Sequence, residues 1–591
     1  MKIRVADYIA QFVAKQVKDV FLLSGGGIMH LTDGIACTPE LNPVCCLHEQ
    51  AAAMAMDAYA RITGNFAVGY FTTGPGATNA ITGLAGAWLD SVPCMFISGQ
   101  VKRQDTISHT NIPSIRQVGV QEIDIIPVVQ SLTKYAAMVS NPESIRYHLE
   151  AAMWFAKSGR PGPVWLDIPL DIQSAYVETE TLPGFTPQKH QVSDQDYVPL
   201  IDAFKAAKRP VILAGQGIRL AGAINHLRKF VMHYDIPIVT TYLGVDLIDS
   251  SSQNYVGRIG IKGDRAGNLT MQNADLLLVI GASLPVAETG YDLNQFAPRA
   301  RLIIADIEPR TQYRIPGVSE FYECDAKQFL ADITGLMWDH HIPHYGNWLA
   351  RCIAWKNKYP VCLPEYAADP TSKVNLYYFI DQLCQHLNPA DIIVTDAGSA
   401  FYAGSQGVKI KQGMRYITSG GLATMGFGIP ASIGASIAAG KRRVMCITGD
   451  GSFQQNIQEL QTIIHHELPI KIFVINNEGY LSIRATQGKF FDGRMMGEGC
   501  TSGVTFPNLE RITRAYQIPF YKVINTENAD MAIEATIKTK GPIICEVMTP
   551  PDQEIIPTIS SFKMPDGTMV SKPLEDMYPF LDRKEYEENM R

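Results

Sequence analysis

The chain has 591 residues, enough for about three or four domains at roughly 150 residues each, which excludes a small peptide-like scaffold. Hydrophobic residues make up 46% and charged residues 18%, the profile of a globular protein rather than a disordered one. The net charge of −7 leaves no basic field for nucleic acid or an anionic membrane, so chemistry on small molecules is the favoured class of function.

The cysteines and the first residues indicate the compartment. The 11 cysteines form no CxxC pair, and Cys45, Cys46, Cys94 and Cys446 lie in apolar stretches, where a thiol behaves as a small hydrophobe. Residues 1–7 lead into a charged amphipathic pattern rather than a signal sequence, and no segment reaches the roughly 18 uncharged apolar residues of a membrane span. We expect a soluble cytoplasmic protein without a targeting segment.

Short apolar runs alternate with helical patterns in the first part of the chain. Three runs have the composition of buried strands: residues 20–23, 67–71 and 94–97. A helical pattern at residues 50–61 separates the first two, and strand, helix, strand predicts a parallel sheet. The polar, proline-containing residues 178–199 indicate a linker, so the first domain is predicted at residues 1–177.

Two more sets of strands follow the linker. The second set comprises residues 210–213, 236–239, 276–280 and 302–305, and the third comprises 392–395, 444–447 and 470–475. We therefore predict an α/β protein of three doubly wound parallel-sheet domains at residues 1–177, 190–340 and 365–591. Ligands of such sheets bind at the carboxyl ends of the strands.

A glycine-rich turn follows the predicted strand 444–447 and leads into a predicted helix at residues 454–465. Gly449 and Gly451 let the backbone approach a ligand, the helix start offers free amides to oxyanions, and Asp450 can hold a hard cation. A Gly-Asp-Gly sequence alone is common in ordinary turns.

A second candidate ligand lies at the end of the next strand. Asn477 follows Asp450 by 27 residues, a spacing that permits one strand-to-strand crossover. The Asp450 carboxylate, the Asn477 amide oxygen and the Gly479 carbonyl can then converge on Mg²⁺ bound to a diphosphate. Gly-Asp-Gly followed at this distance by Asn-Asn resembles the signature of thiamine-diphosphate enzymes.

Thiamine chemistry also needs a carboxylate that protonates the aminopyrimidine ring of the cofactor. Glu49 stands before an alanine- and methionine-rich helical pattern, where burial would favour the shared-proton state. Taken alone, a glutamate at a helix start is more often only a partner of the helix dipole.

Further segments resemble the acetolactate synthase family in order and spacing over nearly the whole chain: residues 24–27, 48–50, 72–79, 160–164, 167–169 and 421–430. The resemblance implies that Glu49 activates the cofactor, that Met425 bends it, and that Gly26 and Gln121 flank its reacting carbon. It also implies cofactor contacts from residues around the two halves of the site: Pro75, Asn79, Ser399, Ala423, Gly449, Gly451, Ser452 and Tyr480.

In that family the site forms between the first domain of one subunit and the third domain of another. The resemblance therefore implies a homodimer or homotetramer. It does not indicate whether a regulatory subunit exists.

The acceptor side departs from the family. The segment Arg-Phe-Asp-Asp-Arg, whose arginines recognise a carboxylate acceptor, is replaced by residues 283–287, which begin with Ser283 and end with Ala287. Other predicted acceptor residues are Val120 for an aromatic, Leu170 for a lysine, Thr486 for a tryptophan, and Leu481.

We expect from these changes a larger and less cationic acceptor pocket. The hypothesis is that pyruvate remains the donor and that the acceptor is a bulkier carbonyl compound without a nearby carboxylate, such as a nucleotide-activated ketosugar. Residues 572–578 resemble the subgroup that adds two-carbon branches to such sugars. The alternatives are ordinary drift in an authentic acetolactate synthase, a simple 2-keto acid decarboxylase or oxidase, and a non-catalytic subunit.

FAD is a candidate second cofactor. Residues 215–219 and 257–263 resemble the FAD-holding domain of the family, although glycine-rich turns alone are weak indications and some relatives leave this domain empty or fill it with a nucleotide. His465 and His466, at a predicted helix end, are interpreted as surface residues rather than metal ligands.

Overall fold

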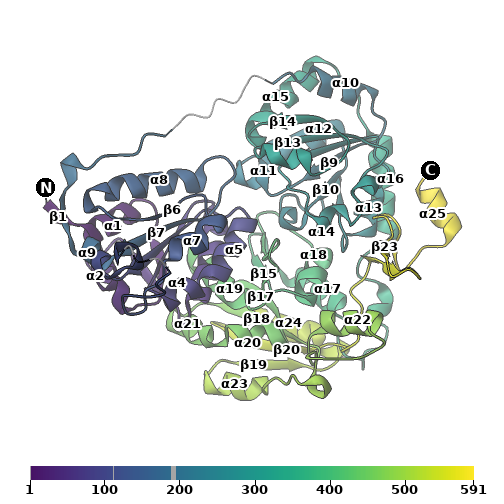
Figure 1. The fold of residues 1–591 in the computed structure, drawn as a ribbon. Coiled ribbons are helices and arrows are strands. Elements are labelled where there is room, and N and C mark those ends of the chain that lie inside the picture. The colour runs from purple at the N-terminus through teal and green to yellow at the C-terminus, as the bar shows by residue number, and fades with distance from the viewer. Residues whose placement is uncertain (1, 111, 113, 188–194) are drawn as a thin grey trace.

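The computed structural model describes residues 2–110, 112, 114–187 and 195–591, and it contains three six-stranded parallel sheets, each flanked by helices (Figure 1). The predicted α/β class with three parallel sheets is confirmed. The strands of the three sheets fall at residues 19–169, 210–323 and 392–548.

The first sheet has the strand order β3-β2-β4-β5-β7-β6. Its strands are β2 (Asp19–Leu22), β3 (Asn42–Cys45), β4 (Ala67–Phe71), β5 (Cys94–Gln100), β6 (Ala136–Met138) and β7 (Val164–Pro169). Helices α3 (Glu49–Thr63) and α5 (Ile81–Leu89) cover one face; α1 (Val5–Ala14), α2 (Met29–Ala36) and α8 (Ile145–Lys157) cover the other. The short helices are α4 (Pro75–Asn79), α6 (Ile107–Thr110), α7 (Ile125–Val129) and α9 (Leu170–Ser174).

The second sheet has the order β11-β10-β9-β12-β13-β14. Its strands are β9 (Pro210–Ala214), β10 (Ile238–Thr240), β11 (Tyr255–Arg258), β12 (Leu276–Ile280), β13 (Arg301–Asp306) and β14 (Val318–Glu323). The helices around it are α10 (Val198–Ala206), α11 (Gly217–Leu220), α12 (Ile224–Tyr234), α13 (Arg265–Gln272), α14 (Val286–Thr289), α15 (Ala326–Asp339) and α16 (Gly346–Lys358).

The third sheet has the order β16-β15-β17-β18-β20-β19. Its strands are β15 (Ile392–Thr395), β16 (Arg415–Ile417), β17 (Val444–Gly449), β18 (Ile470–Asn476), β19 (Phe520–Val523) and β20 (Ile543–Met548). Its helices are α17 (Leu376–His386), α18 (Ser399–Gly407), α19 (Gly428–Ala438), α20 (Asp450–Gln455), α21 (Leu460–His465), α22 (Leu481–Phe490), α23 (Leu509–Ala515) and α24 (Ala529–Lys538).

The helix predicted at residues 454–465 differs in the structure. It begins earlier, at Asp450, and it is interrupted at Asn456, whose backbone leaves the helical region. The Asn456 side chain donates to the carbonyl of Gly426 at 2.7 Å and to the side chain of Gln50 at 3.2 Å. These contacts with distant parts of the chain hold the break and are invisible in the local pattern.

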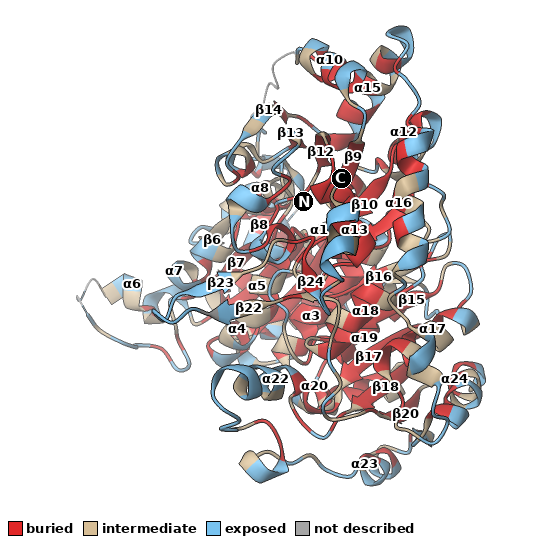
Figure 2. Ribbon diagram, turned by 90° about the vertical axis from the view of Figure 1, so that its right-hand side faces the viewer, coloured by how far each residue is buried: buried red, intermediate tan, exposed pale blue. Residues whose placement is uncertain are grey.

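The first and third sheets share one hydrophobic core. Helix α3 packs against α19 so closely that a Cβ on Gly434 would lie 1.9 Å from the carbonyl oxygen of Ala55, and both helices are buried in the centre of the molecule (Figure 2). The two domains are also joined through Arg61, which pairs with Asp57 and Asp90 of the first domain at 2.7 Å each and donates to the Thr418 carbonyl of the third domain at 2.9 Å. The first and third domains therefore form one packed unit.

The chain beyond β20 leaves the third sheet and packs on the second domain (Figure 1). It contains β21 (Thr558–Ile559), β22 (Ser561–Lys563), β23 (Met569–Ser571), β24 (Met577–Tyr578) and α25 (Arg583–Asn589). Polar side chains at the end of α13 bind it, since Gln272 donates to Glu575 at 2.7 Å and Asn273, the residue after the helix, donates to the Asn589 carbonyl at 3.1 Å. The segment resembling a branched-sugar subgroup, residues 572–578, thus lies on the second domain.

Part of the predicted linker, residues 188–194, lies outside the described residues, and so does the predicted start of the second domain at 190. Within the described ranges, no helix is long and apolar enough to cross a membrane.

Candidate active site

The predicted diphosphate turn lies where two neighbouring strands end. Strands β17 and β18 are paired, with Gly449 opposite Ile475, so Asp450 and Asn477 leave the sheet at the same edge. The Asp450 carboxylate is 3% exposed and accepts the backbone N–H of Gly451 at 2.8 Å and that of Gly479 at 3.1 Å. The structure thus brings together the three predicted metal ligands.

The donor set fits a magnesium ion. The Asn477 Oδ1 atom is buried and has no hydrogen-bond partner among the residues the structure describes, and burial raises the pKa of Asp450 to about 6. An orphaned amide oxygen beside a desolvated carboxylate is the arrangement that a hard cation stabilises. No group of three or more His, Cys, Asp or Glu that could hold a metal occurs in the described part of the chain.

Glycine is required at Gly479. Its φ is 148°, and an added Cβ would lie 2.0 Å from the carbonyl oxygen of Glu498. Arg484 fixes the neighbouring backbone by donating to the Asn477 carbonyl at 3.2 Å and by pairing with Glu498 at 2.6 Å. The loop that offers the Gly479 carbonyl is therefore rigidly held.

The other predicted cofactor contacts of the third domain surround this turn. The Tyr480 ring lies against Gly451, where a Cβ would be 2.3 Å from the ring, and Ser452 is buried in α20, whereas Gly449 has open space beside it. Ser399 is the first residue of α18 and is buried. Ala423, with a φ of 53°, precedes the half-buried Met425.

Asp396, which the sequence reasoning missed, holds the Met425 loop. Its carboxylate accepts the N–H groups of Gly426 at 3.0 Å and Gly428 at 2.9 Å, and the hydroxyl of Thr448 at 3.0 Å. Burial raises the pKa of Asp396. An acid directly after the predicted strand 392–395 is the signal that could have found it.

Glu49 is the first residue of α3 and is 6% exposed. Its Oε2 atom accepts the side-chain amide of Asn79 at 3.0 Å, and a Cβ on Gly76 would lie 3.4 Å from its Oε1 atom. Pro75 begins the short helix that carries Asn79. The structure therefore places the buried Glu49 beside the exposed Pro75 and Asn79 in the first domain.

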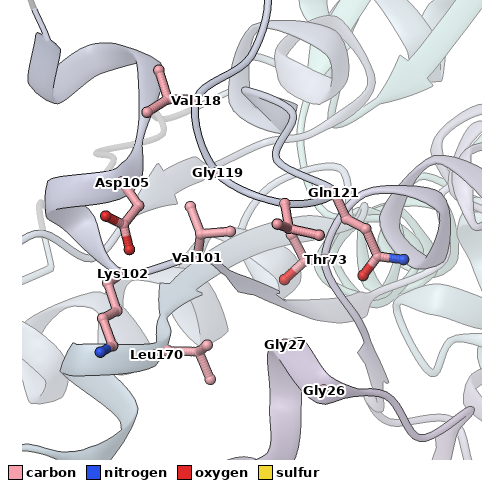
Figure 3. A pocket seen from close by; sticks show the side chains of 11 residues that line it. Gly26, Gly27, Thr73, Val101, Lys102, Asp105, Val118, Gly119, Gln121 and Leu170 are labelled. Atoms are coloured by element: carbon pink, nitrogen blue, oxygen red, sulfur yellow. The ribbon is translucent and has the colours of Figure 1, made fainter.

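A cavity of about 470 Å³ opens at the carboxyl ends of the first sheet's strands (Figure 3). Four predicted residues line it: Gly26, Val120, Gln121 and Leu170. Gln121 has a φ of 64°, and its carbonyl oxygen would lie 2.3 Å from a Cβ on Gly74. Lys102 and Asp105 also line this first cavity and were missed, because no motif marks them.

The remaining predicted acceptor residues lie elsewhere in the single chain. Ser283 and Ala287 line a second cavity of about 510 Å³, and Leu481 and Thr486 belong to α22 of the third domain. No hydrogen bond or ion pair among the described residues joins Glu49 to Asp450. Within one chain, the predicted site residues thus belong to all three domains.

The second cavity lies between the first and second domains. The predicted FAD turn contributes Gln216 and Gly217, and Asp306 and Glu288 lie in the same lining. Burial raises the pKa of Glu288 to about 8. The other predicted FAD segment, residues 257–263, binds the C-terminal segment instead, since Lys262 donates to the Ile555 carbonyl at 3.0 Å.

Known families match all three domains. Models of thiamine pyrophosphate (thiamine diphosphate) enzymes match residues 3–147 as the N-terminal TPP binding domain, 199–333 as the central domain and 396–547 as the C-terminal TPP binding domain. Together with the Asp450 turn, these matches define a thiamine-diphosphate enzyme.

Similar proteins identify the family within the thiamine-diphosphate enzymes. Acetolactate synthase isozyme 2 large subunit of Escherichia coli (strain K12) is 32% identical, covering 95% of this chain and 98% of its own length. Acetolactate synthase large subunits of Cyanidium caldarium, at 32% (94% of each chain), and Porphyra purpurea, at 31% (92% of this chain and 91% of its own), are similar over the same span. The chain belongs to the thiamine-diphosphate-dependent acetolactate synthase-like family.

Proposed function

We propose that the chain is a Mg²⁺- and thiamine-diphosphate-dependent carboligase, a transferase that decarboxylates pyruvate and joins the remaining acyl unit to an acceptor carbonyl. The observation that carries this proposal is the oxygen site of Asp450 and Asn477, with its unpartnered Asn477 Oδ1 atom. When bound, thiamine diphosphate supplies a carbon nucleophile and an electron sink for decarboxylation of a 2-keto acid.

Glu49 is the proton-handling residue of this proposal. Its buried carboxyl group would exchange a proton with the aminopyrimidine ring. Asn79 positions it by donating to Oε2, which leaves Oε1 for the ring. Gly26 and Gln121 would line the reacting centre, and Met425 would support the bent cofactor.

A homo-oligomer follows from the family that the sequence resembles, in which the first domain of one subunit and the third domain of another complete each site. Glu49 lies in the first domain of this chain and Asp450 in the third. We propose a homodimer or homotetramer, with no nucleic acid or membrane partner, located in the cytoplasm.

The acceptor is proposed to be a bulky ketone, such as a nucleotide-activated ketosugar. Val120 is 84% exposed at the mouth of the first cavity and Leu170 lies in its wall, where aromatic and lysine side chains are expected from the family. The two arginines that the family has at the positions of Ser283 and Ala287 are absent, which also favours an acceptor without a carboxylate. The alternative acceptor is a second 2-keto acid, as the names of the relatives indicate.

One experiment separates the candidates. The protein is incubated with thiamine diphosphate, Mg²⁺ and pyruvate, alone and with a panel of ketone acceptors, and the products are identified by mass. We expect ligation products with bulky ketones. Efficient formation of acetolactate alone would establish the alternative, and release of aldehyde or acid alone would indicate a decarboxylase or oxidase.

FAD is proposed for the second cavity. Asp306 stands at the carboxyl end of β13, the place where a carboxylate binds a ribose hydroxyl in dinucleotide folds. Flavin absorbance of the purified protein, with and without added FAD, tests this. A protein that stays colourless after incubation with FAD would contradict it.

A further inference from the structure

A lysine ammonium lies in the first cavity beside Leu170, the position where the family is expected to have a lysine. Strands β5 and β7 are neighbours, and Gln100 pairs with Pro169 at their carboxyl ends. Lys102 follows Gln100 by two residues and Leu170 follows Pro169 by one, so both emerge at the same edge of the sheet (Figure 3). The cation expected at the end of β7 is thus replaced by one at the end of β5.

Lys102 is available to a ligand. Its side chain is exposed and makes no hydrogen bond or ion pair with any residue the structure describes, and it is the one cationic side chain among those lining this cavity. The adjacent Arg103 already binds other protein groups: its Nε atom pairs with Asp171 at 2.7 Å, and its Nη1 atom donates to the Ser140 carbonyl at 2.6 Å.

The surroundings hold Lys102 in place. The backbone N–H of Arg103 donates to Asp171 at 3.0 Å, which ties the residue after Lys102 to the residue after Leu170. On the opposite wall, the buried Glu122 carboxylate accepts the N–H groups of Ile107, Val118 at 2.9 Å and Gly119 at 3.0 Å. Hydrogen bonds within the protein therefore fix the backbone on both walls of the cavity without a ligand.

The lining has two chemically distinct ends. Lys102 and Asp105 lie at one end, and Gln121 and Gly26 lie at the other (Figure 3). A lysine donates only and an ionised aspartate accepts only, so the polar end matches a ligand that carries both an oxyanion and hydroxyl donors. A plain 2-keto acid has no hydroxyl for Asp105.

We propose that Lys102 is a specificity-determining residue that binds a phosphate group of the acceptor, while Asp105 binds its hydroxyl groups. The acceptor class is then a phosphorylated polyhydroxy ketone, and its carbonyl lies toward Gln121. This inference rests on the proposed carboligase function and narrows its acceptor. It also amends the expectation of a less cationic pocket, because the positive charge is displaced rather than lost.

The test compares the holoenzymes of wild type, K102M and K102R with a K18M control. Lys18 is an exposed lysine just before β2, at the amino end of the strands and so on the far edge of the same sheet. Acceptors are fructose 6-phosphate, a nucleoside-diphosphate-activated ketosugar, free fructose and 2-ketobutyrate. Three quantities are measured: acceptor KM, acceptor binding by calorimetry without pyruvate, and pyruvate consumption without acceptor.

We expect K102M to weaken binding and raise KM for the phosphorylated acceptors by about tenfold or more, as loss of a charge-assisted hydrogen bond requires. K102R should retain most of the affinity, and K18M should match wild type. Pyruvate consumption without acceptor should be the same in K18M as in wild type.

Two results would overturn the proposal: equal binding of phosphorylated ketones by wild type and K102M, or a larger effect of K102M on 2-ketobutyrate than on the phosphorylated ketones. Absence of pyruvate consumption in wild type would refute the proposed function instead. The calorimetric comparison would still decide the role of Lys102.

Discussion

The carboxylate of Asp450 accepts the backbone N–H of Gly479 at 3.1 Å, across two neighbouring strands of the third sheet. This bond closes one side of an oxygen site whose other side, the Asn477 Oδ1 atom, has no partner in the described protein. The proposed metal ion and the diphosphate would therefore bind at this edge of the sheet.

Replacing Asn477 should remove most of the thermal stabilisation that Mg²⁺ and thiamine diphosphate give the folded protein. We expect Mg²⁺ with thiamine diphosphate to raise the Tm of wild type, because a ligand that binds only the folded state stabilises it. N477A should lose most of that rise and bind the cofactor at least about tenfold more weakly. Thermal unfolding with and without EDTA measures both effects.

The matched control is N525A, which removes a half-buried asparagine that donates to Glu527 at 3.1 Å and accepts from Asn528 at 2.6 Å. It should respond to the ligands like wild type. An unchanged ligand response in N477A would remove Asn477 from the metal site.

The carboxyl group of Glu49 should be needed for chemistry rather than folding. E49Q keeps a carbonyl oxygen that can accept from Asn79, so the fold and Tm should change little. Because the amide cannot exchange the proton, pyruvate consumption should fall by about 100-fold or more.

N79A tests how Glu49 is positioned, and its rate should fall less than that of E49Q. E40Q, at an exposed glutamate of the same domain, serves as the control and should keep full activity. Full pyruvate consumption by E49Q would refute the assignment of Glu49.

Patterns of neighbouring residues in the sequence were enough to predict much of the fold and the residues of the cofactor site. The apolar runs at residues 67–71 and 276–280 coincide with β4 and β12, because strands buried on both faces are continuously apolar. The turn at Asp450 was predictable because strand end, glycine and acid are contiguous in the sequence.

The remaining features depend on contacts between distant segments. Lys102 becomes a cavity residue only because β5 and β7 are neighbours, although β6 separates them in the chain. The break at Asn456 depends on Gly426 and Gln50, which lie in other elements. Leu481 and Ala287, predicted to share a pocket, lie in different domains, and no sequence pattern encodes that distance.

Asp167 should make stability depend on pH. Burial raises its pKa to about 7, although Ser98 at 2.6 Å and Gln100 at 3.0 Å donate to it. A carboxyl whose folded pKa is raised binds its proton more tightly in the native state. Its contribution to stability is therefore complete below the ordinary value of 3.8 and is lost as pH rises through about 7.

D167N removes this titration while keeping one oxygen for the donors. We expect the Tm of wild type to fall by a few degrees relative to that of D167N as the pH rises from about 5 to about 8. This range of about three pH units includes the pH at which folded Asp167 loses its proton. Thermal unfolding across that range measures the difference. A Tm difference that is independent of pH would show that Asp167 keeps one protonation state.

Arg61 should be a main stabiliser of the contact between the first and third domains. It is 9% exposed, pairs with Asp57 and Asp90, and donates to the Thr418 carbonyl of the third domain at 2.9 Å. R61M would leave two buried carboxylates without their cation, which costs about 3–5 kcal/mol. Asp90 would lose the cation that neutralises it, although it would still accept hydrogen bonds from the N–H groups of Gly420 and Gly421.

We therefore expect R61M to lower the midpoint of urea unfolding strongly. The control is R514M, which breaks an exposed pair with Glu510 at 2.6 Å and should cost at most about 1 kcal/mol. Equal unfolding midpoints for the two variants would mean that the buried Arg61 cluster contributes no more than a surface ion pair, and that packing of α3 on α19 alone holds the domains together.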